Sequence, residues 1–149
     1  MIKMRIVGLV ICAAALGFSA CNLGPGISEI PEISFESVVP NVVTEYQDSL
    51  YFTISYRDGD GDLGENNTDD NNLFIQDSRN QVVYGFRIQQ LAPDNATISI
   101  QGNINVTLAN TAIINGGASE SVSYTIWVVD RAGNESNKVN SSSVTVNAQ

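Results

Sequence analysis

The sequence predicts an all-β protein folded as an antiparallel sandwich. Apolar and polar residues alternate in several short runs, which is the period of a strand that buries one face. β-Branched residues are frequent, and no stretch has a convincing helical period. Clusters of Asn, Asp, Gly and Pro separate the runs, as expected of turns.

The alternation also places the individual strands. The clearest covers 50–56, with Leu50, Phe52 and Ile54 on one face. Another has apolar residues of one parity from 98 to 108, with Gly102 in a gap as an expected β-bulge. Further strands are expected over 33–38, 73–76, 82–90, 122–128 and 144–146.

Roughly seven short strands in one small domain are typical of an immunoglobulin-like sandwich, and a small barrel is the alternative. The expected turns fall at 58–72, 93–95, 115–117 and 131–134. No internal repeat or second domain is visible, so we expect a single domain over residues 32–149.

The N-terminal residues predict export from the cell. Lys3 and Arg5 precede an apolar run over 6–18, which is the pattern of a signal peptide. The run is too short for a transmembrane helix, which needs about 20 apolar residues. Residues 1–20 are therefore expected to be removed, and Cys12 is lost with them. The chain that remains has no cysteine pair and cannot form an internal disulfide.

The end of this run, Phe18-Ser19-Ala20-Cys21, resembles the lipobox of bacterial lipoproteins. The resemblance implies that Cys21 becomes the N-terminus and carries covalent lipid, with acyl chains such as palmitate. Residues 21–31 would then be a Gly- and Pro-containing tether to a membrane. An ordinary signal peptide cut after Ala20 is the alternative interpretation.

Composition limits the chemistry and the partners. The chain has 7 basic and 16 acidic residues and no His. Loss of Lys3 and Arg5 leaves five basic residues against the same sixteen acidic ones, a net charge of −11. This charge argues against nucleic acid and anionic lipid as electrostatic partners. The absence of His excludes Ser-His nucleophile systems and His-ligated zinc.

Six of the sixteen acidic residues lie between Asp58 and Asp70. Asp58, Asp60 and Asp62 alternate with glycine, which lets a tight loop direct several carboxylates to one point. Three such groups repel one another without a cation, and calcium prefers six to eight hard oxygen ligands. We therefore expect a calcium site on this loop, with Asn66 and Asp69 as additional candidate ligands. A solvated acidic turn is the alternative.

The spacing resembles an EF-hand loop only in part. Leu63 replaces the glycine expected at its sixth position, and Asp69 replaces the bidentate Glu at the twelfth. A predicted strand also precedes the loop where the EF-hand has a helix. The sequence therefore favours a DxDxD calcium loop on a β scaffold over an EF-hand.

A second motif follows the strand at 122–128. The residues from Asp130 to Ser136 resemble the D-x-A-G-N-x-S hairpin of bacterial immunoglobulin-like surface domains. In such a sandwich, the strands at 50–56 and 122–128 run in the same direction, so the loops after them share one end. Asp130 is therefore a further candidate calcium ligand, although a plain β-turn explains the hairpin equally well. Glu29 and Glu32 are expected near the same end.

Taken together, the lipobox, the DGDGDLG loop and the hairpin resemble small lipoproteins of the Bacteroidota type. The resemblance implies a lipid anchor in the cell envelope, most often the outer membrane. The resemblance bears on location and fold more than on activity. Taken as a whole, the sequence favours a non-catalytic, calcium-stabilised binding or accessory module whose partner is an envelope protein or a glycan.

Two rival functions are weighed against this one. A carbohydrate-binding lipoprotein of a glycan-uptake system would use Trp127 as a stacking platform, although such a residue is more often covered by a neighbouring strand or loop. A carboxylate-dependent glycosidase is less favoured, because the acidic residues are clustered on a Gly-rich loop. We therefore do not expect an enzyme.

Overall fold

The computed structural model describes residues 26–149, which form ten β-strands and no helix. The prediction of an all-β protein is therefore confirmed over this range. No helix among these residues is long and apolar enough to cross a membrane. The predicted signal peptide at 1–20 and the lipid on Cys21 lie outside the described residues.

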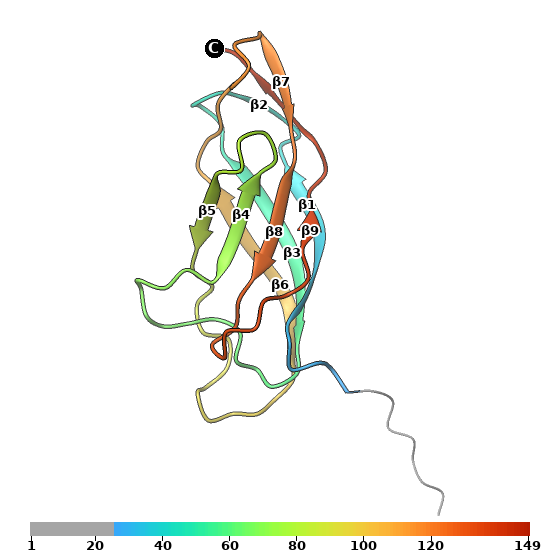
Figure 1. Cartoon of the computed structure of the whole chain (residues 1–149), viewed down its shortest axis with the longest axis vertical. Helices are drawn as coiled ribbons and strands as arrows, with labels where there is room; N and C mark the ends of the chain where they lie inside the picture. Colours follow the sequence, from blue (N-terminus) through green and yellow to red (C-terminus); the bar gives the residue numbers. More distant parts are fainter. Residues whose placement is uncertain (1–25) are drawn as a thin grey trace, which may run out of the picture.

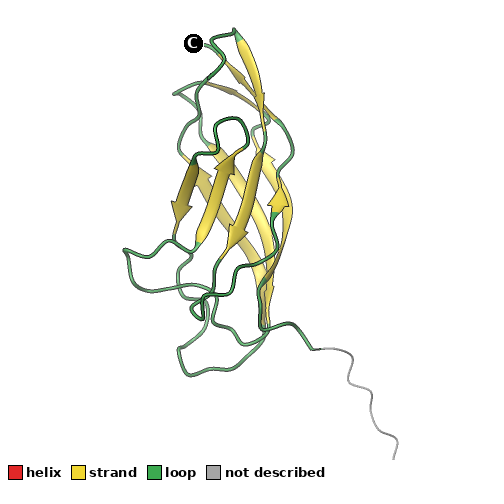
Figure 2. Ribbon diagram, viewed as in Figure 1, coloured by secondary structure: helices red, strands yellow, loops and turns green. Residues whose placement is uncertain are grey.

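Three sheets make up the domain (Figure 2). The first has the order β1-β3-β6, with β1 at Glu32–Val39, β3 at Leu50–Asp58 and β6 at Ile100–Leu108. The second has the order β5-β4-β8-β9, with bounds Val83–Phe86, Leu73–Asp77, Tyr124–Val128 and Val139–Asn140. A small third sheet joins β2 at Val42–Thr44, β10 at Val144–Asn147 and β7 at Ser119–Val122.

The first two sheets lie one behind the other and enclose the core (Figure 1). Along β3 every second residue from Leu50 to Asp58 is buried, as the alternation predicted. The aromatic centre of the core is an edge-to-face contact between Phe52 and Tyr124, whose ring centroids are 5.3 Å apart. This packing is consistent with a β-sandwich.

The bulge predicted at Gly102 was wrong. The pairing of β3 with β6 continues without a shift from Leu50↔Leu108 to Asp58↔Ile100, and Gly102 pairs directly with Tyr56. A side-chain carbon on Gly102 would lie only 3.1 Å from the Tyr56 hydroxyl, so the glycine makes room for that ring. The register shift occurs instead in β1, between Phe35 and Ser37.

The single strand predicted over 122–128 is divided at Ser123. Val122 is the last residue of β7, which pairs with β10, and Tyr124–Val128 form β8, which pairs with β4 and β9. The backbone carbonyl of Ser123 accepts a hydrogen bond from Ser78 N at 3.1 Å, which marks the change of sheet. Side-chain alternation continues through the break, so the sequence pattern does not reveal it. Likewise, only Val83–Phe86 of the strand predicted over 82–90 pairs as β5.

One end of the sandwich collects the long loops and the start of the chain. Figure 1 shows the loops after β3, β5 and β8 at the end where residues 26–31 enter, opposite the C-terminus. We call this the acidic end, because β3 delivers Asp58 to it. The other end carries the third sheet and the turn between β4 and β5.

Candidate metal centre

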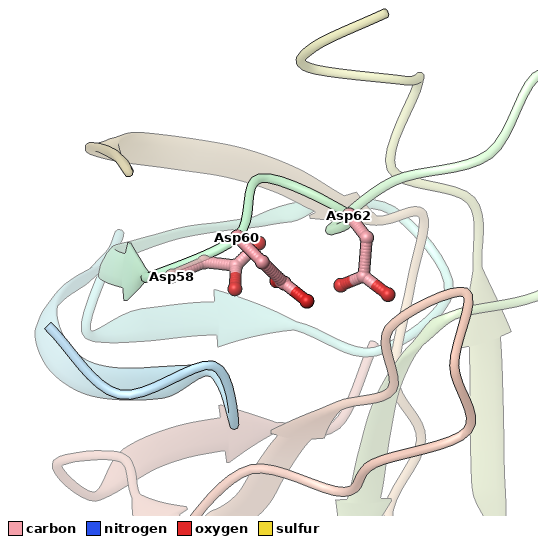
Figure 3. A group of neighbouring side chains, drawn as sticks. All are labelled: Asp58, Asp60 and Asp62. Carbon is pink, nitrogen blue, oxygen red and sulfur yellow. The ribbon is translucent and has the colours of Figure 1, made fainter. Parts of the chain in front are cut away.

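Three carboxylates meet at the acidic end. One oxygen from each of Asp58, Asp60 and Asp62 lies within 4.8 Å of the other two. Figure 3 shows the three side chains on one short stretch of loop, with their carboxylates gathered on the same side of it. Asp58 is completely buried, and the other two are half-buried. We call these residues the three-carboxylate centre.

The loop is shaped by its glycines and by one apolar side chain. Gly61 and Gly64 have φ angles of +79° and +92°, which L residues rarely adopt. Leu63 between them is completely buried in the core and fixes the loop to the domain. Its N–H donates to Asp58 Oδ2 at 2.9 Å, so the carboxylate closes the loop across five residues. Leu63 stands where an EF-hand loop has glycine, and its side chain packs in the core of this domain.

The carboxylates are under electrostatic strain in the absence of a cation. One oxygen of each of the three, Oδ1, is buried and has no hydrogen-bond partner among residues 26–149. Burial raises the pKa of Asp58, and the negative charge of Asp60 raises it further. Burial and the charge of Asp130 raise the pKa of Asp62 to about 6. Buried, unpaired carboxylate oxygens are costly unless a proton or a cation satisfies them.

The hairpin after β8 packs directly against this loop, as the predicted topology required. Ala132 N donates to Asp62 Oδ2 at 3.0 Å, and Arg131 N donates to the Asp62 carbonyl at 3.2 Å. These bonds join segments about seventy residues apart in sequence. The charge of Asp130 is near enough to raise the pKa values of Asp58 and Asp62.

Asp130 nevertheless lies outside the three-carboxylate centre. Both of its oxygens accept hydrogen bonds from Asn134, Oδ1 from the backbone N–H at 2.7 Å and Oδ2 from the side-chain amide at 2.9 Å. Its carboxylate therefore closes the hairpin turn. The geometry therefore favours a plain β-turn at Asp130 over a role as a metal ligand. Asp130 affects the three-carboxylate centre only through its negative charge.

Arg131 contacts the acidic loop from the hairpin after β8, but among the described residues it forms no ion pair with the three carboxylates. Its guanidinium donates to the Gly64 carbonyl at 2.8 Å and to the Gly61 carbonyl at 3.4 Å. It braces the loop through the backbone. This role of Arg131 was not predicted from the sequence, because the contact depends on two loops that are distant in sequence and meet only in the folded domain.

The remaining predicted site residues lie elsewhere. The Asn66 amide hydrogen-bonds to Gln90, and Asp69 is exposed, so neither joins the three-carboxylate centre. Glu29 and Glu32 are exposed as well and are not part of it.

Trp127 lies on the outer face of β8, between β4 and β9. Its ring stacks on Phe74 of β4, with centroids 5.4 Å apart. The Lys138 ammonium, just before β9, lies 4.6 Å from the ring centroid. Because β4 and β9 flank β8 on opposite sides, the Trp127 ring lies between Phe74 and Lys138. This packing is expected of an indole covered by the strands next to it.

Comparison with protein-family models, with curated proteins and with solved structures gave no match. The metal that the three carboxylates could bind therefore follows from the chemistry of their oxygens. Carboxylate oxygens alone select hard cations such as calcium and magnesium over softer metals. Asp58, Asp60 and Asp62 could hold one such ion.

Proposed function

We propose that this protein is a non-catalytic binding module of the bacterial cell envelope, stabilised by calcium at the three-carboxylate centre. The observation that carries the proposal is the set of buried Oδ1 atoms on Asp58, Asp60 and Asp62, none of which has a hydrogen-bond partner. A cation placed among them would satisfy all three and remove their mutual repulsion.

Calcium is favoured over magnesium because of its coordination chemistry. It accepts six to eight oxygens in flexible geometry, whereas magnesium requires a near-ideal octahedron and keeps several waters.

The proposal includes an immunoglobulin-like fold and a lipid anchor on Cys21. In support of the fold, a three-stranded sheet faces a four-stranded one, and the β2–β10 pair is parallel while the other pairs are antiparallel. In support of the anchor, the lipobox-like residues 18–21 lie a few residues before the point where the chain enters the domain at its acidic end.

The test is the thermal unfolding of the full protein in mild detergent, in excess calcium and in EDTA. Calcium at about 100 times its dissociation constant adds about 2.7 kcal/mol to the free energy of unfolding. For a domain of this size we expect a rise of about 10 °C in the melting temperature. Equal melting temperatures up to millimolar calcium would contradict the proposal.

Two matched variants locate the effect. Asp60→Asn removes one charge from the three-carboxylate centre, and we expect it to abolish the calcium-dependent rise. Asp69→Asn makes the same chemical change on an exposed residue of the same loop, and we expect the rise to persist. A loss of the rise in Asp69→Asn alone would place the ion elsewhere on the loop.

A further inference from the structure

We infer that an ion at the three-carboxylate centre acts as a latch that holds the N-terminal segment, residues 26–31, against the domain. The inference rests on the proposed calcium site and assigns it a regulatory consequence. Its basis is a set of contacts that converge on Gly59, the residue between Asp58 and Asp60.

The N-terminal segment contacts the acidic loop through its backbone. Gly59 N donates to the Ser28 carbonyl at 2.7 Å. The approach is so close that a side-chain carbon on Gly59 would lie 2.3 Å from the Ile27 carbonyl oxygen and 2.6 Å from that of Ser28. Only glycine permits this contact, so any side chain at position 59 would block docking of the segment. The hydrogen bond to Ser28 in turn requires Gly59 to keep its position.

Gly59 is also joined to the rest of the domain. Its carbonyl accepts a hydrogen bond from Ser99 Oγ, just before β6, at 3.0 Å. The neighbouring Asp58 is completely buried, and its Oδ1 has no hydrogen-bond partner among the described residues. The docking residue therefore lies between two of the side chains that an ion would draw together.

Ion binding and docking should therefore depend on each other. Without a cation, repulsion among the carboxylates favours opening of the loop, which moves Gly59 away from Ser28. With a cation, the closed loop presents the Gly59 N–H to the segment. By linkage, docking must raise the affinity for the ion by the same factor as the ion favours docking.

The readout is cleavage by a Glu-specific protease after Glu29, which is exposed but lies in the docked segment. The protease needs several extended residues, so cleavage follows the population of the undocked state. We expect excess calcium to slow this cut by about 5- to 150-fold relative to EDTA, the usual range of coupling between sites. The cut after Glu45, in the turn that follows β2 at the opposite end, is the internal reference.

Two glycine variants give the test a matched control. Gly59→Ala keeps every carboxylate but blocks docking, so we expect its Glu29 cut to be as fast in calcium as the wild-type cut in EDTA. Its calcium affinity should fall by the same factor. Gly26→Ala adds the same carbon where no atom lies within 4 Å, and it should behave as the wild type. Ser99→Ala, which loosens Gly59 without a clash, is the milder variant and should give an intermediate rate.

The melting temperature, measured on the same samples, separates the latch from the site. A calcium-dependent rise in melting temperature with a slower Glu29 cut supports the latch. The same rise with an unchanged Glu29 cut overturns the latch and leaves the calcium site standing. If neither the melting temperature nor the cut responds to calcium, both proposals are overturned.

Discussion

Each end of the sandwich contains a buried aspartate, and the two aspartates differ in whether an arginine pairs with the carboxylate. At the far end, β4 finishes at Asp77, which is 1 % exposed. Arg79 meets both of its oxygens, through Nε at 3.0 Å and through a terminal nitrogen at 2.6 Å. The same guanidinium also bonds to Glu120 at 3.0 Å and to the Ala112 carbonyl at 2.9 Å.

At the acidic end, β3 ends at Asp58, which is equally buried, but no arginine in the described part of the chain contacts its carboxylate. Arg131 lies at this end too and bonds to loop carbonyls instead. A buried carboxylate needs a compensating partner. The far end contains the partner of its buried aspartate, whereas at the acidic end the Oδ1 of Asp58 has no partner among the described residues. The ion that we propose for this centre would supply the missing positive charge from solution.

The largest expected effect comes from removing the internal cation. Arg79→Met leaves Asp77 buried without its partner, which costs about 3–5 kcal/mol of unfolding free energy. We expect this loss by denaturant unfolding to be the same in calcium and in EDTA. Arg57→Met, on an exposed arginine of β3, should stay within about 0.5 kcal/mol of the wild type. A calcium-dependent loss in Arg79→Met would contradict the separation of the two ends.

The next effect compares one chemical change at both ends. Asp58→Asn keeps an oxygen for Leu63 N and removes a charge, so in EDTA it should be as stable as the wild type or more so. In excess calcium it should lack the gain of about 2.7 kcal/mol. Asp77→Asn should destabilise the protein in both conditions, because Arg79 loses its bidentate acceptor. Equal behaviour of the two variants would mean that the ends do not differ.

The smallest effect is the pH dependence contributed by Asp62 at the acidic end. The pKa of Asp62 is about 6 in the folded protein, above its ordinary value of 3.8, so the folded state binds the proton more tightly than the unfolded state. In EDTA, the stability contributed by this group therefore rises as the pH falls from 7 toward 4. Melting temperatures at pH 7 and pH 5 should show this gain, and excess calcium should abolish it because the ion then competes with the proton.

Much of the fold was predictable because burial imposes a period on the strands. The alternation at Leu50–Tyr56 identified β3. The strand directions expected in a sandwich then predicted that the hairpin of Asp130 and the acidic loop lie at the same end, where the two are in contact. The same pattern could not locate the break at Ser123, since a strand that changes sheets keeps its alternation.

For the candidate site too, the residues that are close in sequence were predictable, and the contacts that depend on the fold were not. Asp58, Asp60 and Asp62 were predictable because they lie within five residues of one another. Asn66 and Asp69 were chosen by analogy to a helical loop, and on a β scaffold the chain leaves the centre after Leu63 enters the core. The Arg79–Glu120 pair spans 41 residues and carries no local signal, so it was not predicted.

The position of the N-terminal segment also has a mechanical consequence. The segment and the C-terminus lie at opposite ends of the long axis (Figure 1), and β1 runs along that axis. A pull on the segment would act parallel to β1, at right angles to the hydrogen bonds that join it to β3 from Glu32 to Val39. These bonds would be loaded in shear and would have to yield together. The domain would thus resist a force on its N-terminal segment most strongly along this axis. The hydrogen bond between Gly59 and Ser28 would be the first contact to break.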